Sequence, residues 1–171
     1  MPAATIVDGL TGLDQVFEVI DRDVSEIDWQ AFWDGQKGEL EDDHHDYFGR
    51  KVSPHGEPWA KLAASTIKRK GHGSILIDTT ALAKSLTQRG GSGAIRDQFS
   101  SGNMVGLVFG TSVPYAHWHM TGTYTMPARP EVGVTDDRID KMGIEIADLI
   151  ASTIIEADWQ AVVAAGDRLM D

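Results

Sequence analysis

Cysteine is absent from the 171 residues of the sequence. Its absence excludes a disulfide framework, thiolate ligation of zinc or of an iron–sulfur cluster, and a cysteine nucleophile. It also suits assembly in a reducing cytoplasm. No apolar run approaches about 18 residues and no basic-plus-apolar stretch opens the sequence, so we expect neither a membrane span nor a signal peptide. Phosphate-loop and GxSxG motifs are missing as well, and we expect no cofactor.

Basic residues are scarce in the first third of the chain, which carries nearly all of the net charge of −11. Residues 1–50 hold 13 Asp and Glu against three Lys and Arg, whereas residues 51–171 hold 13 against 12. An acidic protein is a poor ligand for phosphate backbones, so we expect no sequence-specific binding of nucleic acid. The acidic segment is either a solvated helix face or a surface that faces a DNA channel or a basic partner, which would make assembly salt-dependent.

Hydrophobic periodicity predicts helices at both ends of the chain and strands between them. We expect a short amphipathic helix over residues 8–22, a second helix over 25–48, and a long helix from about 134 to 157 with a short helical tail. Residues 75–77 are expected to form a short buried strand, followed by a helix capped by Thr79 or Thr80.

AIRDQFSS and MVGLVFGT (residues 94–101 and 104–111) predict two antiparallel strands joined by a turn at residues 101–103. Residues 114–122 are expected to form a short helix or turn, and 123–127 an extended piece. The order of these elements predicts an α+β fold, with N-terminal helices, a small mostly antiparallel sheet, and a long C-terminal helix packed on it.

The length favours one domain, residues 1–171. We divide it into an acidic helical segment over residues 1–50, an α+β core over 51–160 and a tail over 161–171. Five apolar side chains are the core candidates: Trp59, Leu62, Leu82, Ile146 and Ile150.

His117 and His119 are the strongest indication of an enzyme. On a strand, side chains two residues apart point to the same side, so the two imidazoles could share a metal ion; on a helix they point about 200° apart. Possible third ligands, His72, Asp78 and Glu131, show no motif spacing. A metal-dependent hydrolase that uses His117 and His119 is therefore the alternative to a non-enzymatic protein.

MPARP (residues 126–130) predicts a stiff extended segment, because each proline fixes its own backbone and restricts the residue before it. Without N–H groups at Pro127 and Pro130, the segment cannot be a central strand. We expect it to hold Arg129 at or beside a subunit interface, paired with a carboxylate or with carbonyls at a helix end, and contributing little to the core.

Four sequence pieces resemble a known family in their order and spacing. They are GEPWAKL (56–62) with Thr66 and Lys70, ILIDTTALAKS (75–85), GT (110–111) with PYAHWH (114–119) and Gly122, and PARP (127–130) with Gly133. Together they resemble the phage virion morphogenesis family, the tail completion proteins of tailed bacteriophages. The chain is more distantly similar to neck and tail-completion proteins of long-tailed, non-contractile phages. It departs from the family pattern at Thr80, where glycine is usual, and at Glu131-Val132, which replaces a bulkier apolar pair.

This resemblance implies a structural virion protein rather than an enzyme. It implies a place in the neck of the virion, at the head–tail junction, after assembly in the host cytoplasm. The expected partners are further copies of the chain, in a hexameric ring, and other neck and tail proteins, with DNA passing nearby. A tail terminator or adaptor in the same neck is the alternative. The residues expected at an interface are Arg129, Tyr115, Trp118, His119 and Tyr124.

Overall fold

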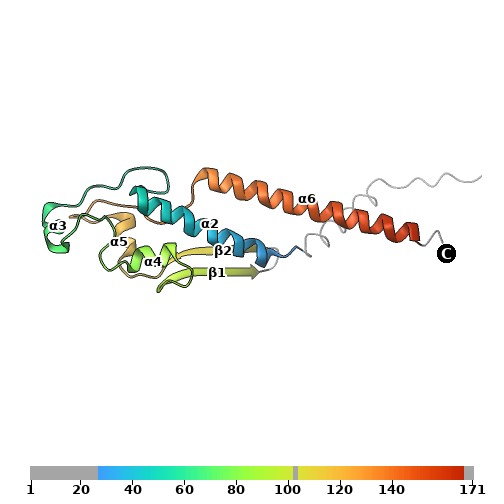
Figure 1. Ribbon diagram of the computed structural model, residues 1–171, viewed down its shortest axis with the longest axis horizontal. Coiled ribbons are helices and arrows are strands. Elements are labelled where there is room, and N and C mark those ends of the chain that lie inside the picture. The colour runs from blue at the N-terminus through green and yellow to red at the C-terminus, as the bar shows by residue number, and fades with distance from the viewer. Residues whose placement is uncertain (1–26, 102–103, 168–171) are drawn as a thin grey trace, which may run out of the picture. The chain divides into compact units, whose positions relative to one another are not determined.

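The computed structural model describes residues 27–101 and 104–167, with side chains described as far as residue 155. Residues 29–138 form one compact unit, and the chain from Ile139 onward belongs to a second one. The elements, in chain order (Figure 1), are α2 Trp29–Arg50, α3 Ala64–Lys70, α4 Ala81–Thr87, β1 Ala94–Ser101, β2 Met104–Thr111, α5 Ala116–Thr121 and α6 Asp136–Asp167. These helices and the two-stranded antiparallel sheet confirm the α+β class.

Helix α2 confirms the helix expected over residues 25–48, and Gly35 and Gly38 lie inside it without breaking it. Its buried side chains follow helical spacing and include Leu40, His44 and Phe48. The helix expected over residues 8–22 lies outside the described residues.

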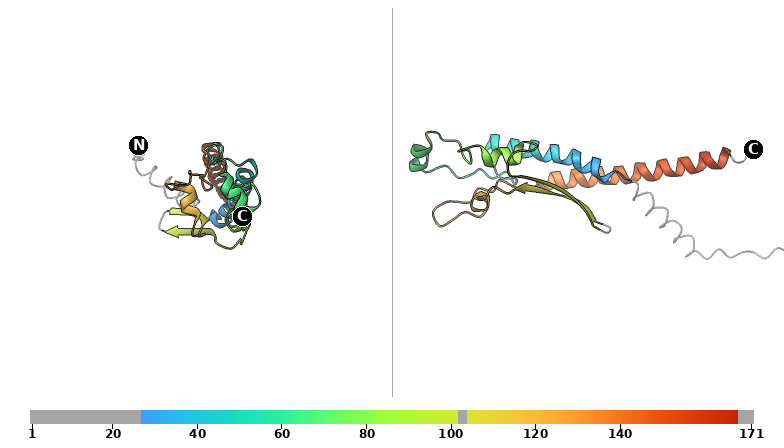
Figure 2. Two further views of the ribbon diagram at one scale, coloured as in Figure 1. Left: turned by 90° about the vertical axis from the view of Figure 1, so that its left-hand side faces the viewer. Right: turned by 90° about the horizontal axis from the view of Figure 1, so that it is seen from below.

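The predicted hairpin is confirmed: β1 and β2 pair in antiparallel register from Ala94 opposite Thr111 to Ser101 opposite Met104. Because directly opposed residues share a face, one face carries Arg96 and Phe109, which contact α2. In Figure 2, α3 and α5 lie beyond the end of the hairpin at which β1 begins and β2 ends.

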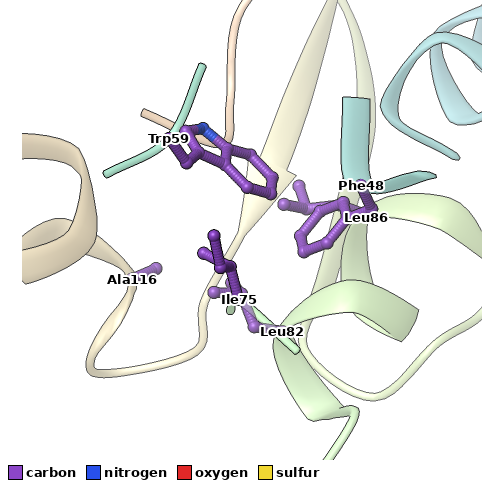
Figure 3. Close-up of a cluster of buried hydrophobic side chains, with 6 residues drawn as sticks. All are labelled: Phe48, Trp59, Ile75, Leu82, Leu86 and Ala116. Atoms are coloured by element: carbon purple, nitrogen blue, oxygen red, sulfur yellow. The ribbon is translucent and has the colours of Figure 1, made fainter. Parts of the chain in front are cut away.

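The core of residues 29–138 gathers around Trp59, whose side chain is only 5% exposed. Its ring meets that of Phe48 edge to face, with 5.3 Å between the ring centroids. Figure 3 shows the buried cluster, which consists of Phe48, Trp59, Ile75, Leu82, Leu86 and Ala116. Leu62 packs against this cluster and is half-buried.

The prediction of a strand over residues 75–77 is wrong. The segment is a turn in which Leu76 has a left-handed backbone, with φ of 56°, although Ile75 is buried as expected. Three apolar residues in a row indicated burial, which a compact turn provides as well as a strand does. Thr80 precedes α4 but makes no side-chain capping hydrogen bond, and its φ is 65°.

Helix α6 begins where Thr135 accepts a hydrogen bond from the N–H of Arg138, at 3.1 Å, through its side-chain oxygen. Asp136 and Asp137 in the first turn suit the positive end of the helix dipole. The helix continues to Asp167, so the expected tail forms part of the same helix. Ile146 and Ile150 are half-buried. None of the described helices has a stretch long and apolar enough to span a bilayer.

Candidate interaction surface

Four segments of the 29–138 unit line a partly open cavity of about 640 Å³. They are residues 61–70 with α3, the turn at 76–80, α5 and residues 125–129. Each of the four sequence pieces that resemble the family contributes to this wall, through Lys61 and Lys70, Asp78, His119, and Arg129 respectively. Segments far apart in the sequence thus converge on one site.

Positive backbone angles shape the turns that border the cavity. Gly71 ends α3 at φ 77° and donates its N–H to the carbonyl oxygen of Ile67. Gly122 ends α5 at φ 72°, and a Cβ there would lie 2.7 Å from the backbone nitrogen of Ala128. Only glycine allows α5 and the PARP segment to approach so closely.

Arg129 is buried, with 4% of its surface exposed. Its Nε donates to the carbonyl oxygen of Ala60 at 2.8 Å, and Nη2 donates to that of Lys61 at 3.2 Å. Its backbone N–H donates to the carbonyl oxygen of His119 at 2.6 Å. Arg129 therefore joins the chain before α3 to α5 and to its own proline-flanked segment.

The expectation that Arg129 contributes little to the core is wrong, because its buried guanidinium bonds the segment before α3 and its backbone N–H bonds α5. Its partners are carbonyls, as one alternative predicted, but they precede α3. Arg129 also lines the cavity, where another chain could reach it. Its expected position beside a subunit interface therefore stays a prediction. Burial lowers the pKa of this guanidinium.

His117 and His119 lie on helix α5, so they do not share one side as the metal-site hypothesis requires. His117 is exposed, whereas His119 is half-buried and packs its ring edge to face against Tyr115. The Nδ1 of His119 is buried and has no hydrogen-bond partner among the residues that the structure describes. Burial, then the nearby charges of Arg129 and Lys70, lower the pKa of His119. Throughout the described residues no group of three His, Asp or Glu is placed to hold a metal ion.

The aromatic side chains named as interface candidates are exposed rather than buried in the core. Trp118 is about half exposed and Tyr124 is fully exposed. Tyr124 lies in a tight turn closed by hydrogen bonds between Thr123 and Met126. Their exposure leaves both rings free to contact another chain, and that role stays a prediction.

Sequence reasoning missed the most connected side chain of the unit, Arg96. Its guanidinium pairs with Glu41 at 3.0 Å, lies 3.6 Å from the centre of the Phe109 ring, and donates to the carbonyl oxygens of Ser85 and Leu86. It therefore fastens β1 to α2 and α4. The available signal was a lone arginine at an inward position of an alternating strand, which requires internal partners.

The outward face of the hairpin was also missed. Phe99, Met104 and Val108 lie on the face opposite Arg96 and are 45%, 65% and 49% exposed. The ring of Phe99 lies over Gly106, where an added Cβ would come within 2.6 Å of it. The alternation of faces along each strand contained this signal, because every second residue of a strand lies on the same face.

Most of the chain matches a known protein family. The model of the phage virion morphogenesis family matches residues 28–152. The match begins at α2, so part of the acidic first third, for which the sequence pieces gave no resemblance, lies within it. Searches of curated proteins and of solved structures give no significant match. The matched range contains the cavity, the hairpin and the Arg96 contacts, and the chain belongs to the phage virion morphogenesis family.

Proposed function

We propose that the protein is a structural component of the head–tail junction, where a closed ring of identical subunits completes the tail and joins it to the head. Family membership supports a structural role in virion assembly. The observation that best supports a ring is the exposed apolar face of the hairpin, formed by Phe99, Met104 and Val108.

Two physical arguments support this use of the hairpin face. A two-stranded sheet is marginally stable alone and is stabilised by burying its faces. Among the described elements, α2 and α4 contact the hairpin, and they cover the face that carries Arg96 and Phe109. Several large apolar side chains exposed on one face are typical of a surface that another protein covers.

A closed ring needs two different patches on each subunit. At every interface, the first patch of one subunit binds the second patch of its neighbour. The hairpin face is one candidate patch. The second is the α5 region, where Tyr115, Trp118 and Tyr124 are exposed. Aromatic side chains of this kind contribute strongly to interfaces.

The test combines particle assembly with the mass of the purified protein. Phage lacking the gene should accumulate unjoined heads and tails, and wild-type protein supplied in trans should restore joining. Val108→Asp should fail to restore joining and should lower the mass of the purified oligomer.

Ser100→Asp is the matched control, because Ser100 is exposed on the opposite face of the same hairpin. It should behave as wild type. Normal joining with Val108→Asp, or a wild-type protein that is monomeric in solution and in the particle, would overturn the proposal.

A further inference from the structure

The cavity between α3 and α5 is positively charged in a protein whose net charge is −11. Its wall contains four cationic side chains, Lys61, Arg69, Lys70 and Arg129, and one carboxylate, Asp78. None of these four cations forms an ion pair with any described residue. The excess positive charge therefore lacks compensation within this part of the chain.

The absence of a compensating negative charge is most unfavourable at Arg129. Its guanidinium is buried, yet its partners are two neutral carbonyl oxygens. A buried charge is stabilised far better by an opposite charge than by neutral dipoles alone. The Nδ1 of His119 is also buried, and no group in the described part of the chain forms a hydrogen bond with it. A carboxylate entering the cavity could accept hydrogen bonds from Arg129 and, through an Nδ1–H tautomer, from His119.

We propose that this cavity binds carboxylate side chains from the acidic segment, residues 8–23, of a second copy of the chain. This inference rests on the proposed ring of identical subunits. The segment contains Asp8, Asp14, Glu18, Asp21 and Asp23 and one basic residue, Arg22. An acidic segment on one subunit and a basic cavity on the next are two unlike patches, as a closed ring requires.

The geometry favours a peptide over nucleic acid as the occupant. The cavity lies between four chain segments, and Arg129 at its wall is almost fully covered. A thin carboxylate side chain can enter such a space, whereas the phosphates of a duplex remain at its surface. The net charge of −11 also repels a DNA backbone.

The lack of cysteine in the natural chain allows a direct test by disulfide formation. Full-length chains carrying Thr66→Cys in the cavity wall are mixed with chains carrying Glu18→Cys and exposed to mild oxidant. We expect a mixed dimer of the two chains. Ser65→Cys is the matched control, because Ser65 is exposed on the same helix but does not line the cavity. It should give at least about tenfold less mixed dimer, since disulfide geometry is demanding.

A charge-reversal pair tests the electrostatic part of the inference. Arg69→Glu should weaken self-association at least about tenfold, whereas Lys68→Glu should leave it within about twofold. Both residues are exposed in the last turn of α3, and only Arg69 lines the cavity. Combining Arg69→Glu with Asp14→Lys and Glu18→Lys should restore association, because the reversed charges attract again.

Three results would overturn the inference. The first is a disulfide that forms within single chains carrying both cysteines but not between chains. The second is equal association of the Arg69→Glu and Lys68→Glu variants. The third is binding of a labelled DNA duplex that Arg69→Glu abolishes. If rings and head–tail joining persist while the cavity variants have no effect, the proposed function stands and this inference alone fails.

Discussion

Trp59 donates its indole N–H to the carbonyl oxygen of Pro130 at 2.8 Å, and so fastens the chain before α3 to the PARP segment. The same indole packs edge to face on Phe48. One side chain therefore joins two of the sequence pieces that resemble the family and covers the core between them.

Trp59→Ala is expected to lower the free energy of unfolding by about 3 kcal/mol or more, because it leaves a large cavity in the core. Trp59→Phe should cost less, since it keeps an aromatic ring and loses the hydrogen bond. Chemical denaturation measures both. Trp118→Ala, at a half-exposed position, is the control and should change stability by less than about 1 kcal/mol. An unchanged midpoint for Trp59→Ala would contradict its place in the core.

Arg129→Ala is expected to destabilise the isolated chain by about 2–3 kcal/mol, because the carbonyl oxygens of Ala60 and Lys61 lose their donor inside the protein. Arg129→Lys should recover only part of the loss, since an ammonium group lacks the planar fork that reaches both oxygens. Thermal melting next to a size measurement separates folding from assembly.

Arg50→Ala serves as the control for this measurement. Arg50 is exposed, and among the described residues its ion-pair partner is Asp46 of the same helix. Its removal should cost less than about 0.5 kcal/mol. A normal melting temperature for Arg129→Ala would show that the bonds to Ala60 and Lys61 do not stabilise the fold.

Thr80→Gly is expected to raise the free energy of unfolding by about 1 kcal/mol. Thr80 has a left-handed backbone, with φ of 65°, and this conformation is unfavourable for a β-branched residue. Glycine adopts it without strain, although it adds entropy to the unfolded chain. Thr79→Gly is the control, because Thr79 has no positive φ and the same substitution should destabilise. The opposite order of the two melting midpoints would contradict the assignment of strain to Thr80.

Glu131 should make stability fall as pH rises. Its side chain is fully buried, neither carboxyl oxygen has a hydrogen-bond partner among the described residues, and burial raises its pKa to about 8. Between its ordinary pKa of 4.5 and about pH 8, the folded state keeps a proton that the unfolded state has lost. The free energy of unfolding therefore decreases through this window and stays low above it, by on the order of 2–4 kcal/mol.

Glu131→Gln removes this titration and should be more stable than wild type at pH 8, with a smaller difference near pH 5. The two proteins must be compared at each pH, because His44 changes stability with pH in the direction opposite to Glu131. Burial lowers the pKa of His44, so its contribution to stability decreases as pH falls through and below its usual pKa of 6.5. Urea unfolding of both proteins across the range measures the difference, and parallel pH curves would contradict the burial of an uncompensated carboxyl at Glu131.

Periodic patterns predicted the parts of the fold that follow from local spacing. Helix α2 was predicted from its apolar residues, and the hairpin from two strand-like runs on either side of a turn. The turn at Leu76 was not predicted, because a short apolar run does not reveal a positive φ. The positive φ at Thr80 could have been predicted. The family usually has glycine at this position, and glycine is the residue that a left-handed backbone favours.

The candidate site was predicted only in part, for a physical reason. The stiffness of the PARP segment follows from its prolines, but the burial of Arg129 depends on the carbonyls of residues 60 and 61, far away in sequence. The cavity likewise requires four distant segments to meet. Long-range contacts of this kind leave no periodic trace in a single sequence.

The open face of the hairpin also bears on how the protein survives before assembly. Phe99, Met104 and Val108 on an uncovered sheet would promote aggregation of newly made chains, but Asp97 lies directly opposite Val108 on the same face. A charged side chain within an apolar face disfavours non-specific association of one sheet with another. A specific partner can still bind this face if the carboxylate stays in contact with water at the edge of the interface. In the proposed ring, this face would stay exposed while chains are scarce and become buried as subunits accumulate.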